Sequence, residues 1–472
     1  MKRHVFLSAG LAAALAVSLG FAQTATVPAP SAVVDAVFAR WTASSPGCAA
    51  GVSVDGRIVL ERGYGMADLE RDVANKAETI FEAGSVSKQF TAAAVLLLAR
   101  DGKLSLDDPV RKYVPELPDY GPGRTITIRH MLTHTSGLRD WGEVAGLAGW
   151  PRGRRVHTHA HVLDIVSRQK DVNFTPGTNW SYSNTGYNLA AIIVSRVSGK
   201  SFADFSRDRI FQPLGMTHTS WRDDYTRIVK QRAIAYEPST DGYREDMPFE
   251  NVHGNGGLLT TVGDLLRWNE NFVSPKIGDT KFVAEQQTPG RFSDGRAHDY
   301  ALGLYVRTYR GVPEISHSGS TAGYRAFLVR YPAQHVSVAV LCNAASANAT
   351  QYAHAVADAY LGSALTAPAA AAGGGRGAQP AGAFTPADAD LAAYVGRYRS
   401  DEAETELVVA RDGAELVVKR RPDTVLRMRP VARDVFTVPS LGTVTFHRSG
   451  TAVTDLGVKL DRVWDLRFPR VP

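Results

Sequence analysis

The chain has 472 residues, of which 44% are hydrophobic and 21% are charged, and its formal net charge is +6. This length predicts two or three domains with a sizeable core, and the composition excludes a wholly disordered protein. Lys and Arg are scattered rather than clustered, so nucleic acid is not expected as a partner.

The N-terminus has the pattern of a secretory signal peptide. A cationic stretch over residues 1–4 precedes an almost wholly apolar run over 5–21, and the small residues Gly20 and Ala22 suit a cleavage site. We therefore expect residues 1–22 to be removed and the protein to be periplasmic or secreted, with no stable membrane insertion after cleavage. The alternative is a membrane anchor, which the short apolar run and the lack of cations beyond it disfavour.

The next elements alternate between helix and strand. Val34 to Trp41 has helical spacing, and residues 49–63 are typical of two strands around the turn Asp55-Gly56. The apolar run over 89–100 predicts a buried helix. Residues 105–285 combine short helical patterns with loops that contain Pro and Gly.

The following segment returns to strands. Tyr324–Tyr331 and Val336–Cys342 are rich in β-branched and aromatic residues, and Pro332-Ala333-Gln334 separates them. Residues 353–361 have a helical pattern.

The C-terminal part of the chain is set off by its composition. Residues 366–383 are low-complexity Ala, Gly and Pro, which predicts a flexible linker. Beyond it, alternating segments around Asp412-Gly413 predict a hairpin, and more short strands follow. Residues 385–472 are expected to form a small all-β domain that a cut within the linker would separate from a folded remainder.

Ser85-Val86-Ser87-Lys88 is the first pattern that carries chemistry. Residues three apart share a helix face, so the Lys88 amine can take the Ser85 proton as the hydroxyl attacks a carbonyl, provided that the amine is not fully protonated. Ser167 to Lys170 has the same spacing and is typical of a solvated helix end. The setting favours Ser85, because Gly84 precedes it and a long buried helix follows. Taken alone, Ser85 is equally well explained as a helix N-cap.

Two further patterns, Tyr182-Ser183-Asn184 and His317-Ser318-Gly319, change that balance. With the first pattern, and in this order, they resemble the serine β-lactamase/DD-peptidase superfamily, specifically its class C branch with D-aminopeptidases, DD-carboxypeptidases and esterases. The segments that carry this resemblance are 81–92, 104–109, 126–138, 174–187, 211–219, 254–268 and 317–327. The tail, with Leu391 to Tyr398, resembles the C-terminal β-barrel appended to many such hydrolases.

The resemblance implies an α/β (α+β) fold of the β-lactamase type over residues 35–362. An antiparallel sheet with the first hairpin beside the last strand would carry flanking helices, and a mostly helical lobe would be inserted between them. The serine would lie where the two lobes meet.

The resemblance also implies a role for each motif residue. Ser85 would be the acylated nucleophile, and Lys88 would assist acylation. Tyr182 would carry protons as a phenol or phenolate, with Lys88 as the cation that lowers its pKa from about 10. Asn184 would orient Lys88 and the substrate amide. The backbone N–H groups of Ser85 and Ser320 would form the oxyanion hole.

The third motif would bind substrate through His317 and Gly319. Many β-lactamases of this superfamily have Lys at the position of His317, whereas His is familiar among the DD-peptidases and D-aminopeptidases, so efficient β-lactam hydrolysis is in doubt. A histidine is mostly uncharged at neutral pH, and Lys88 nearby would lower its pKa further. We expect it to hydrogen-bond rather than to anchor a carboxylate, so substrates without a carboxylate should react at least as well.

These inferences predict an exported serine hydrolase that works through an acyl-enzyme, without a cofactor, on a peptide or small-molecule substrate. The preferred substrates are D-amino-acid peptides, such as cell-wall fragments, or small esters. The alternatives are a class C-like β-lactamase and a non-catalytic protein that binds peptide or glycan. No metal is expected: His157, His159 and His161 lack a carboxylate or Cys partner and suit an exposed polar loop.

The two cysteines, Cys48 and Cys342, lie at the start of the first strand and at the end of the last one. If these strands pair antiparallel, as the resemblance implies, the two residues lie opposite each other at a separation that suits a disulfide. Two outcomes stay open, a disulfide in an oxidising compartment and a pair of buried free thiols.

Overall fold

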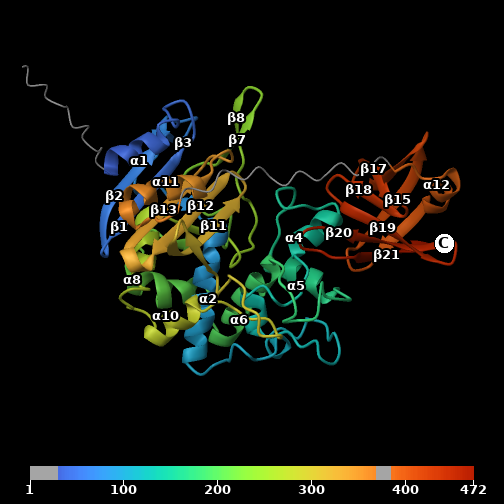
Figure 1. The fold of residues 1–472 in the computed structure, drawn as a ribbon, viewed down its shortest axis with the longest axis horizontal. Helices are drawn as coiled ribbons and strands as arrows, with labels where there is room; N and C mark the ends of the chain where they lie inside the picture. Colours follow the sequence, from blue (N-terminus) through green and yellow to red (C-terminus); the bar gives the residue numbers. More distant parts are fainter. Residues whose placement is uncertain (1–29, 368–383) are drawn as a thin grey trace, which may run out of the picture.

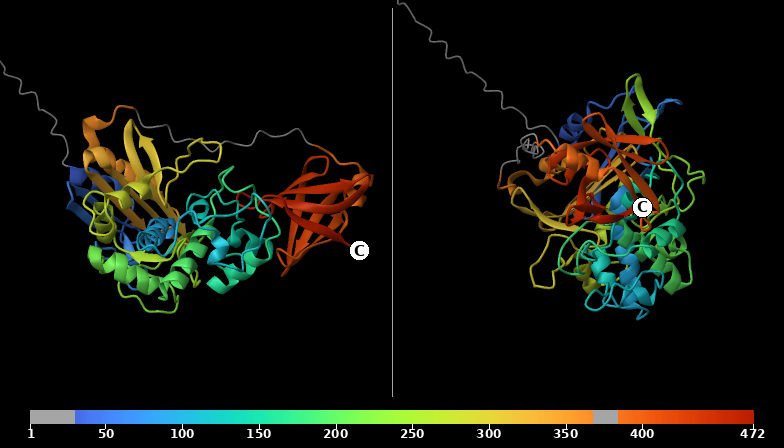
Figure 2. Two further views of the ribbon diagram at one scale, coloured as in Figure 1. Left: turned by 90° about the horizontal axis from the view of Figure 1, so that it is seen from below. Right: turned by 90° about the vertical axis from the view of Figure 1, so that its right-hand side faces the viewer.

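The structure is a computed structural model that describes residues 30–367 and 384–472. The expected signal peptide and nearly all of the expected linker lie outside the described residues. The described chain forms a large mixed domain and a C-terminal barrel, with part of a helical lobe between them (Figures 1 and 2). None of the described helices is long and apolar enough to cross a membrane.

A six-stranded antiparallel sheet organises the large domain. Its strands, in spatial order, are β10 (Tyr305–Tyr309), β11 (Val312–Thr321), β12 (Tyr324–Tyr331), β13 (Val336–Cys342), β1 (Cys48–Val54) and β2 (Arg57–Tyr64). Asp55 and Gly56 both have positive φ, as the two-residue turn between β1 and β2 requires. The first hairpin therefore lies beside the last strand. His317 lies inside β11, five residues after its first residue, Val312.

Helices cover both faces of this sheet, and β1 and β13 are accordingly buried along nearly their whole length. On one face, α1 and α11 pack together, and α11 contacts β12 and β13; on the other face, α9 contacts β13 and β1. The first helix lies earlier in the chain than the predicted 34–41. The helices around the sheet are α1 (Pro30–Phe38), α2 (Lys88–Arg100), α9 (Val262–Glu270), α10 (Thr280–Gln287) and α11 (Ala349–Leu361).

The helical lobe is inserted between β2 and β10, and it contains the helix that begins at Asn184, the last residue of the second motif. Its helices are α3 (Ile128–Leu132), α4 (Trp141–Leu147), α5 (His159–Ser167), α6 (Asn184–Ser198), α7 (Phe202–Ser206) and α8 (Gln212–Leu214). The small strands of the insertion are β3 (Met66–Asp68), β4 (Val73–Ala74), β5 (Phe81–Glu82), β6 (Ser220–Trp221), β7 (Tyr236–Ser239), β8 (Gly242–Glu245) and β9 (Leu258–Thr260).

The C-terminal domain is a closed eight-stranded barrel, with β14 pairing with β21 to complete the circle. Closure leaves no sheet edge exposed. Buried aromatic rings, including Tyr394 and Phe446 in stacked contact, fill the interior. The elements are α12 (Asp388–Tyr394), β14 (Gly396–Ser400), β15 (Thr405–Asp412), β16 (Glu415–Arg420), β17 (Thr424–Ala432), β18 (Val435–Val438), β19 (Gly442–Ser449), β20 (Ala452–Lys459) and β21 (Leu466–Val471).

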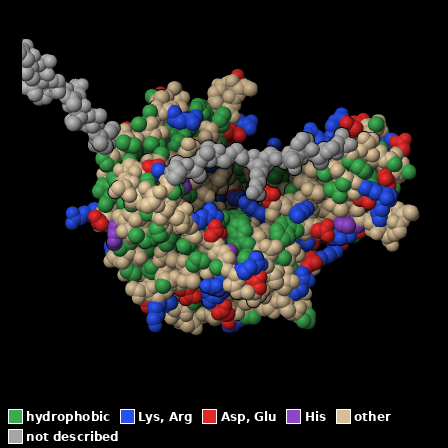
Figure 3. Space-filling model, viewed as in Figure 1, with side chains coloured by type: hydrophobic (Ala, Val, Ile, Leu, Met, Phe, Trp, Pro, Cys, Tyr) green, Lys and Arg blue, Asp and Glu red, His purple; other side chains and the backbone are tan. Residues whose placement is uncertain are grey.

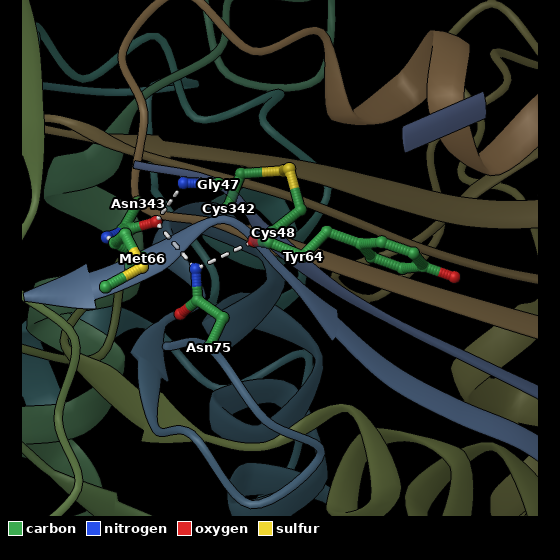
Figure 4. Close-up of a disulfide and its surroundings, with 7 residues drawn as sticks. All are labelled: Gly47, Cys48, Tyr64, Met66, Asn75, Cys342 and Asn343. Carbon is green, nitrogen blue, oxygen red and sulfur yellow. Dashed lines mark hydrogen bonds between the residues drawn. A yellow bond between two sulfur atoms is a disulfide. The ribbon is translucent and has the colours of Figure 1, made fainter. Parts of the chain in front are cut away.

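A disulfide joins Cys48 and Cys342, which are direct partners in the pairing of β1 with β13. Figure 4 shows the bond beside a small polar cluster. There Asn343 Oδ1 accepts hydrogen bonds from the Gly47 backbone N–H at 2.8 Å and from Asn75 Nδ2 at 3.4 Å. The neighbouring strands β1 and β13, which come first and last in the chain order of this sheet, are thus joined by a disulfide as well as by hydrogen bonds.

The barrel docks on the helical lobe through buried polar groups. Arg139 of the lobe forms an ion pair with Glu402 of the barrel, and both side chains are almost fully buried. Arg139 also donates hydrogen bonds to the backbone oxygens of Asp171 and Trp464. Across the same interface, Asn173 Oδ1 accepts from the Trp464 N–H at 2.9 Å. The sequence predicts a separable C-terminal domain and gives no indication of this interface.

Candidate active site

The first motif places a serine and a lysine side by side at the start of α2. Ser85 lies in a 3-10 turn, Gly84–Ser87, and Lys88 begins the helix, so that Lys88 Nζ lies 3.1 Å from Ser85 Oγ. Gly84 has φ +51°, and a Cβ there would come within 2.6 Å of the Ser320 backbone nitrogen. Glycine is therefore needed to let the serine turn approach β11.

Lys88 is buried and surrounded by acceptors. Its Nζ donates to Asn184 Oδ1 at 2.9 Å and to the Asn255 backbone oxygen at 2.8 Å. Burial lowers the pKa of Lys88 well below its usual value, and the positive charge of Arg462 lowers it further. In its neutral form this amine has two N–H bonds for the two oxygens, which leaves its lone pair for the Ser85 hydroxyl proton.

Tyr182 lies just before α6, and its ring centroid is 4.7 Å from Lys88 Nζ. Burial raises the pKa of the Tyr182 phenol, and this outweighs the lowering by the Ser85 hydroxyl and by Arg462. The ring is thus a protonated phenol rather than a phenolate at neutral pH. Two expectations are wrong here. The pKa of Tyr182 is raised rather than lowered, and the nearby cation that acts against this rise is Arg462 of the barrel rather than Lys88.

The edge of β11 supplies backbone donors beside Ser85. In the described sheet, β10 pairs with β11 only as far as Ser316, so the segment from His317 to Thr321 has β12 on one side and the serine turn on the other. Gly319 approaches the turn so closely that a Cβ would lie 2.0 Å from the Ala83 backbone oxygen. The Ser320 N–H lies in this seam, as an oxyanion donor must.

His317 faces the cavity but is buried and fully engaged. Its Nδ1 lies 2.6 Å from the Ser318 backbone oxygen and its Nε2 lies 3.0 Å from the Tyr300 hydroxyl, so the hydrogen-bond network assigns the proton to Nδ1 and lets Nε2 accept from Tyr300. Burial, together with the charge of Lys88, lowers the pKa of His317 to about 3. The residue is neutral at physiological pH and positions Tyr300.

These groups line a cavity of about 720 Å³ that brings together Ser85, Tyr182, Asn184, His317 and Gly319. Arg462, from the segment between β20 and β21 of the barrel, reaches the same cavity. Sequence reasoning missed it, because Arg462 lies in a short polar connection that belongs to no motif. In Figure 3, Lys and Arg side chains gather around the hollow between the large domain and the barrel.

The histidines expected in an exposed loop are instead structural parts of the lobe. Thr158 caps α5, and His161 Nδ1 accepts a hydrogen bond from the Thr158 N–H at 3.1 Å, which completes a capping box. His157 is buried against Trp141, and His159 hydrogen-bonds the backbone oxygen of His253. The interpretation as a loop was wrong because the threonine starts a helix within the tract.

The arrangement provides a hydroxyl, an amine of lowered pKa within hydrogen-bond distance of it, a phenol close to both, and backbone donors across the seam. Such a set can form and break an acyl bond to the serine. An amine takes the hydroxyl proton, backbone dipoles stabilise the oxyanion, and the phenol can protonate a departing group. Asn184 fixes the direction of the amine.

Comparison with known proteins gives matches across both domains. A profile of the family described as Beta-lactamase matches residues 33–363. A penicillin-binding protein of Bacillus subtilis (strain 168) is 31% identical over 302 residues, which cover 58% of this chain and 63% of that protein. A D-aminopeptidase of Cereibacter sphaeroides (strain KD131) is 28% identical over 425 residues, which cover 84% of this chain and 78% of that protein. The chain spans less than two thirds of the length of several other curated relatives.

A solved structure, the octameric penicillin-binding protein homologue from Pyrococcus abyssi, has a similar fold. Its TM-score is 0.61 at 23% identity, and the match covers 93% of this chain and 98% of that chain. The expected β-lactamase-like fold with an additional all-β domain is thereby confirmed.

Proposed function

Because the chain belongs to the beta-lactamase family, we propose that it is a serine hydrolase that cleaves amide or ester bonds through an acyl-enzyme on Ser85. The observation that carries this proposal is the lysine. Lys88 is buried, its pKa is lowered, and two acceptors hold its Nζ 3.1 Å from Ser85 Oγ. A buried lysine placed for packing alone would not need this arrangement.

Acylation follows from these contacts. Ser85 Oγ attacks the substrate carbonyl while its proton moves to Lys88 Nζ. The carbonyl oxygen, now an oxyanion, accepts hydrogen bonds from the backbone N–H groups of Ser85 and Ser320. Removal of one such donor from an oxyanion hole typically costs about 3–4 kcal/mol of transition-state stabilisation.

The leaving group departs with a proton that Tyr182 supplies. The phenol is the right form for this step, because burial keeps it protonated. The transient phenolate lies near Lys88. The proton that Lys88 took from Ser85 then passes to the phenolate and restores the phenol. Deacylation reverses the sequence, with water in place of the leaving group.

For the substrate, we propose D-amino-acid peptides, such as cell-wall fragments, or small esters, met after export of the protein. The D-aminopeptidase names of several relatives support this choice, and so does His317. The neutral histidine differs from the permanently charged lysine found at this position in many β-lactamases, so nitrocefin is expected to be a poor substrate.

A labelling experiment tests the proposal. A fluorophosphonate or penicillin probe should modify Ser85 in the native protein, and Ser85→Ala should abolish the label. Ser167→Ala is the matched control, because Ser167 begins the second S-x-x-K pattern, at the end of α5, and its hydroxyl only donates to the Asp164 backbone oxygen. A folded protein that stays unmodified at Ser85 would refute the proposal and favour a binding role.

A substrate panel then tests the substrate class. D-Aminoacyl amides, D-Ala-D-Ala peptides, short p-nitrophenyl esters and nitrocefin are compared by kcat/KM. Turnover of the first three above nitrocefin is expected. A β-lactamase would give the reverse order.

A further inference from the structure

Arg462 is the feature of the cavity that the proposed reaction does not use. Its guanidinium carbon lies 4.8 Å from the centroid of the Tyr182 ring, and its side chain is 37% exposed. The residue belongs to the barrel, yet it lines the same cavity as Ser85.

The backbone of Arg462 is held firmly by the helical lobe. Its N–H donates to Glu143 Oε2 at 3.0 Å. Its carbonyl oxygen accepts from the Asp140 N–H at 3.2 Å and from Asn173 Nδ2 at 3.0 Å. The position of this one barrel residue is thus fixed by three hydrogen bonds from the other domain, although none of them involves its side chain.

The Arg462 guanidinium itself has no hydrogen-bond partner among residues 30–367 and 384–472. The carboxylate nearest to it is that of Asp140, whose Oδ2 lies 3.9 Å from Nη1, beyond hydrogen-bond distance. The Asp140 oxygens already accept from the backbone N–H groups of Gly142, Glu143 and Asn184. The N–H donors of Arg462 therefore have no hydrogen-bond acceptor within the described chain, and the residue lines the cavity.

The other cationic side chains of the cavity wall are engaged. Arg152 forms a two-pronged ion pair with the buried Glu250. Arg325 donates to the backbone oxygens of Ala322 and Tyr324. With His317 neutral, Arg462 is the cation of this wall, within the described chain, whose guanidinium donates no hydrogen bond to the protein.

We propose that Arg462 binds a carboxylate of the substrate, on the portion that leaves when Ser85 is acylated. A guanidinium with open donors in a half-enclosed cavity suits a carboxylate, which it can bind through two parallel hydrogen bonds. Arg462 lies beside the Tyr182 ring, and Tyr182 protonates the leaving group. The carboxylate therefore belongs to the leaving portion of the substrate rather than to the acyl portion. The preferred substrates are then peptides whose C-terminal residue, with its free carboxylate, is released. This inference rests on the proposed acyl-enzyme reaction.

This proposal revises one expectation drawn from the sequence. Substrates without a carboxylate were expected to react at least as well, because the third motif offers His317 in place of a permanently charged lysine. The neutral state of His317 supports the premise, but the barrel supplies another cation. The preference for a carboxylate should therefore persist at pH 8, where a histidine anchor would be uncharged.

The test uses two peptides that share an acyl part ending in D-Ala and differ only at the leaving D-Ala, which bears a carboxylate or a carboxamide. At pH 8 the full-length protein should favour the carboxylate by at least tenfold in kcat/KM. Arg462→Gln should lower kcat/KM for the carboxylate peptide by about tenfold to hundredfold, mainly through KM, since hydrogen bonds to charged groups are worth about 1.5–3 kcal/mol. The carboxamide peptide should change by less than about threefold.

Two further variants make the result specific. Arg462→Lys keeps the charge but loses the planar fork, so it should retain part of the preference. Arg429→Gln removes the same charge from an exposed site on β17 of the barrel and should leave the preference intact. Equal kcat/KM for the two peptides in the native protein, or an equal fall for both in Arg462→Gln, would overturn the proposal.

A binding measurement separates this inference from the proposed reaction. In Ser85→Ala, calorimetry with the two peptides should give tighter binding of the carboxylate, and adding Arg462→Gln should remove the difference. If neither peptide is hydrolysed while Ser85 still takes the probe, the proposed peptidase activity fails. Equal dissociation constants in Ser85→Ala would then overturn the Arg462 inference independently.

Discussion

Two cationic residues lie at nearly the same distance from the ring of Tyr182, and they come from different domains. Lys88 Nζ is 4.7 Å from the ring centroid and Arg462 Cζ is 4.8 Å from it. Lys88 is fully buried at the start of α2, whereas the Arg462 side chain is 37% exposed at a connection of the barrel.

Burial gives the two residues opposite roles. Burial lowers the pKa of the lysine because a buried ammonium is poorly solvated, and this suits the amine to act as a base. A guanidinium, by contrast, acts as a fixed charge with a planar set of donors. Two side chains of the same formal charge around one phenol can thus divide the chemistry and the recognition between them.

The largest effect on activity is expected from removing the base, Lys88. Lys88→Gln should lower kcat/KM by about 10²–10⁴ for the carboxylate and the carboxamide peptide alike, because a general base contributes to the reaction of both. Lys88→Arg should not restore activity, since a guanidinium cannot accept the proton. Lys170→Gln, in the second S-x-x-K pattern, is the control. A fall that affects one peptide only would assign Lys88 to recognition instead.

The second test undoes the docking that brings Arg462 to the site. Glu402→Ala leaves Arg139 buried without its partner, which should lower the free energy of unfolding by about 3–5 kcal/mol. Preference for the carboxylate peptide should fall at the same time, since the Arg462 connection is held at the same interface. Urea unfolding and the two-peptide assay measure both effects.

The matched control for that test is Glu406→Ala, which removes a carboxylate of the same barrel that pairs with the exposed Arg397. It should change stability little. Equal losses in the two variants would mean that the barrel is not docked through Glu402.

A third test asks whether His317 is a third cation. Its pKa of about 3 lies below the value of about 6.5 expected in the unfolded chain, so the unfolded state binds more protons between these values. Stability should therefore fall as the pH drops from about 6.5 toward 3, by about 1.4 kcal/mol per pH unit from this group. His317→Gln should remove this part of the slope, and His218→Gln, at an exposed site, should not. An unchanged slope in His317→Gln would show that the histidine carries charge.

The smallest expected effect links the two cations. The active lysine is the neutral form, so activity is lost as the pH falls through the lowered pKa of Lys88. The charge of Arg462 contributes to that lowering. In Arg462→Gln, the acid limb of the kcat/KM profile for the carboxamide peptide should move to higher pH by less than about one unit. A shift to lower pH would contradict the assignment.

Much of this site could be predicted where motif and element coincide. The hairpin turn at Asp55-Gly56 follows from turn chemistry, and the strand bounds Tyr324–Tyr331 and Val336–Cys342 follow from runs of β-branched and aromatic residues. Ser85 and Lys88 are three residues apart on one helical face, so their contact is local. The structure also brings Tyr182, Asn184 and His317 to them, as the resemblance implied.

The remainder depends on contacts between distant segments. Arg462 is separated from Ser85 by most of the chain and lies in a connection of a few residues between two barrel strands, where nothing in the spacing indicates a ligand. Its position depends on how the barrel docks on the helical lobe. The ion pair Arg139–Glu402 lies at this interface, but nothing in the sequence distinguishes these two residues from other charged residues. The state of Tyr182 could not be predicted for the same reason, because its pKa depends on burial and on that distant arginine.

The disulfide between Cys48 and Cys342 also determines how the molecule carries mechanical load. The two cysteines are 294 positions apart, and every residue of the first and second motifs lies between them. A pulling force applied between the N-terminal helix and the barrel passes from one cysteine directly to the other across the paired strands. The loop that contains Ser85, Lys88, Tyr182 and His317 is then outside the load path, and tension on the chain ends reaches the active site only through the barrel interface.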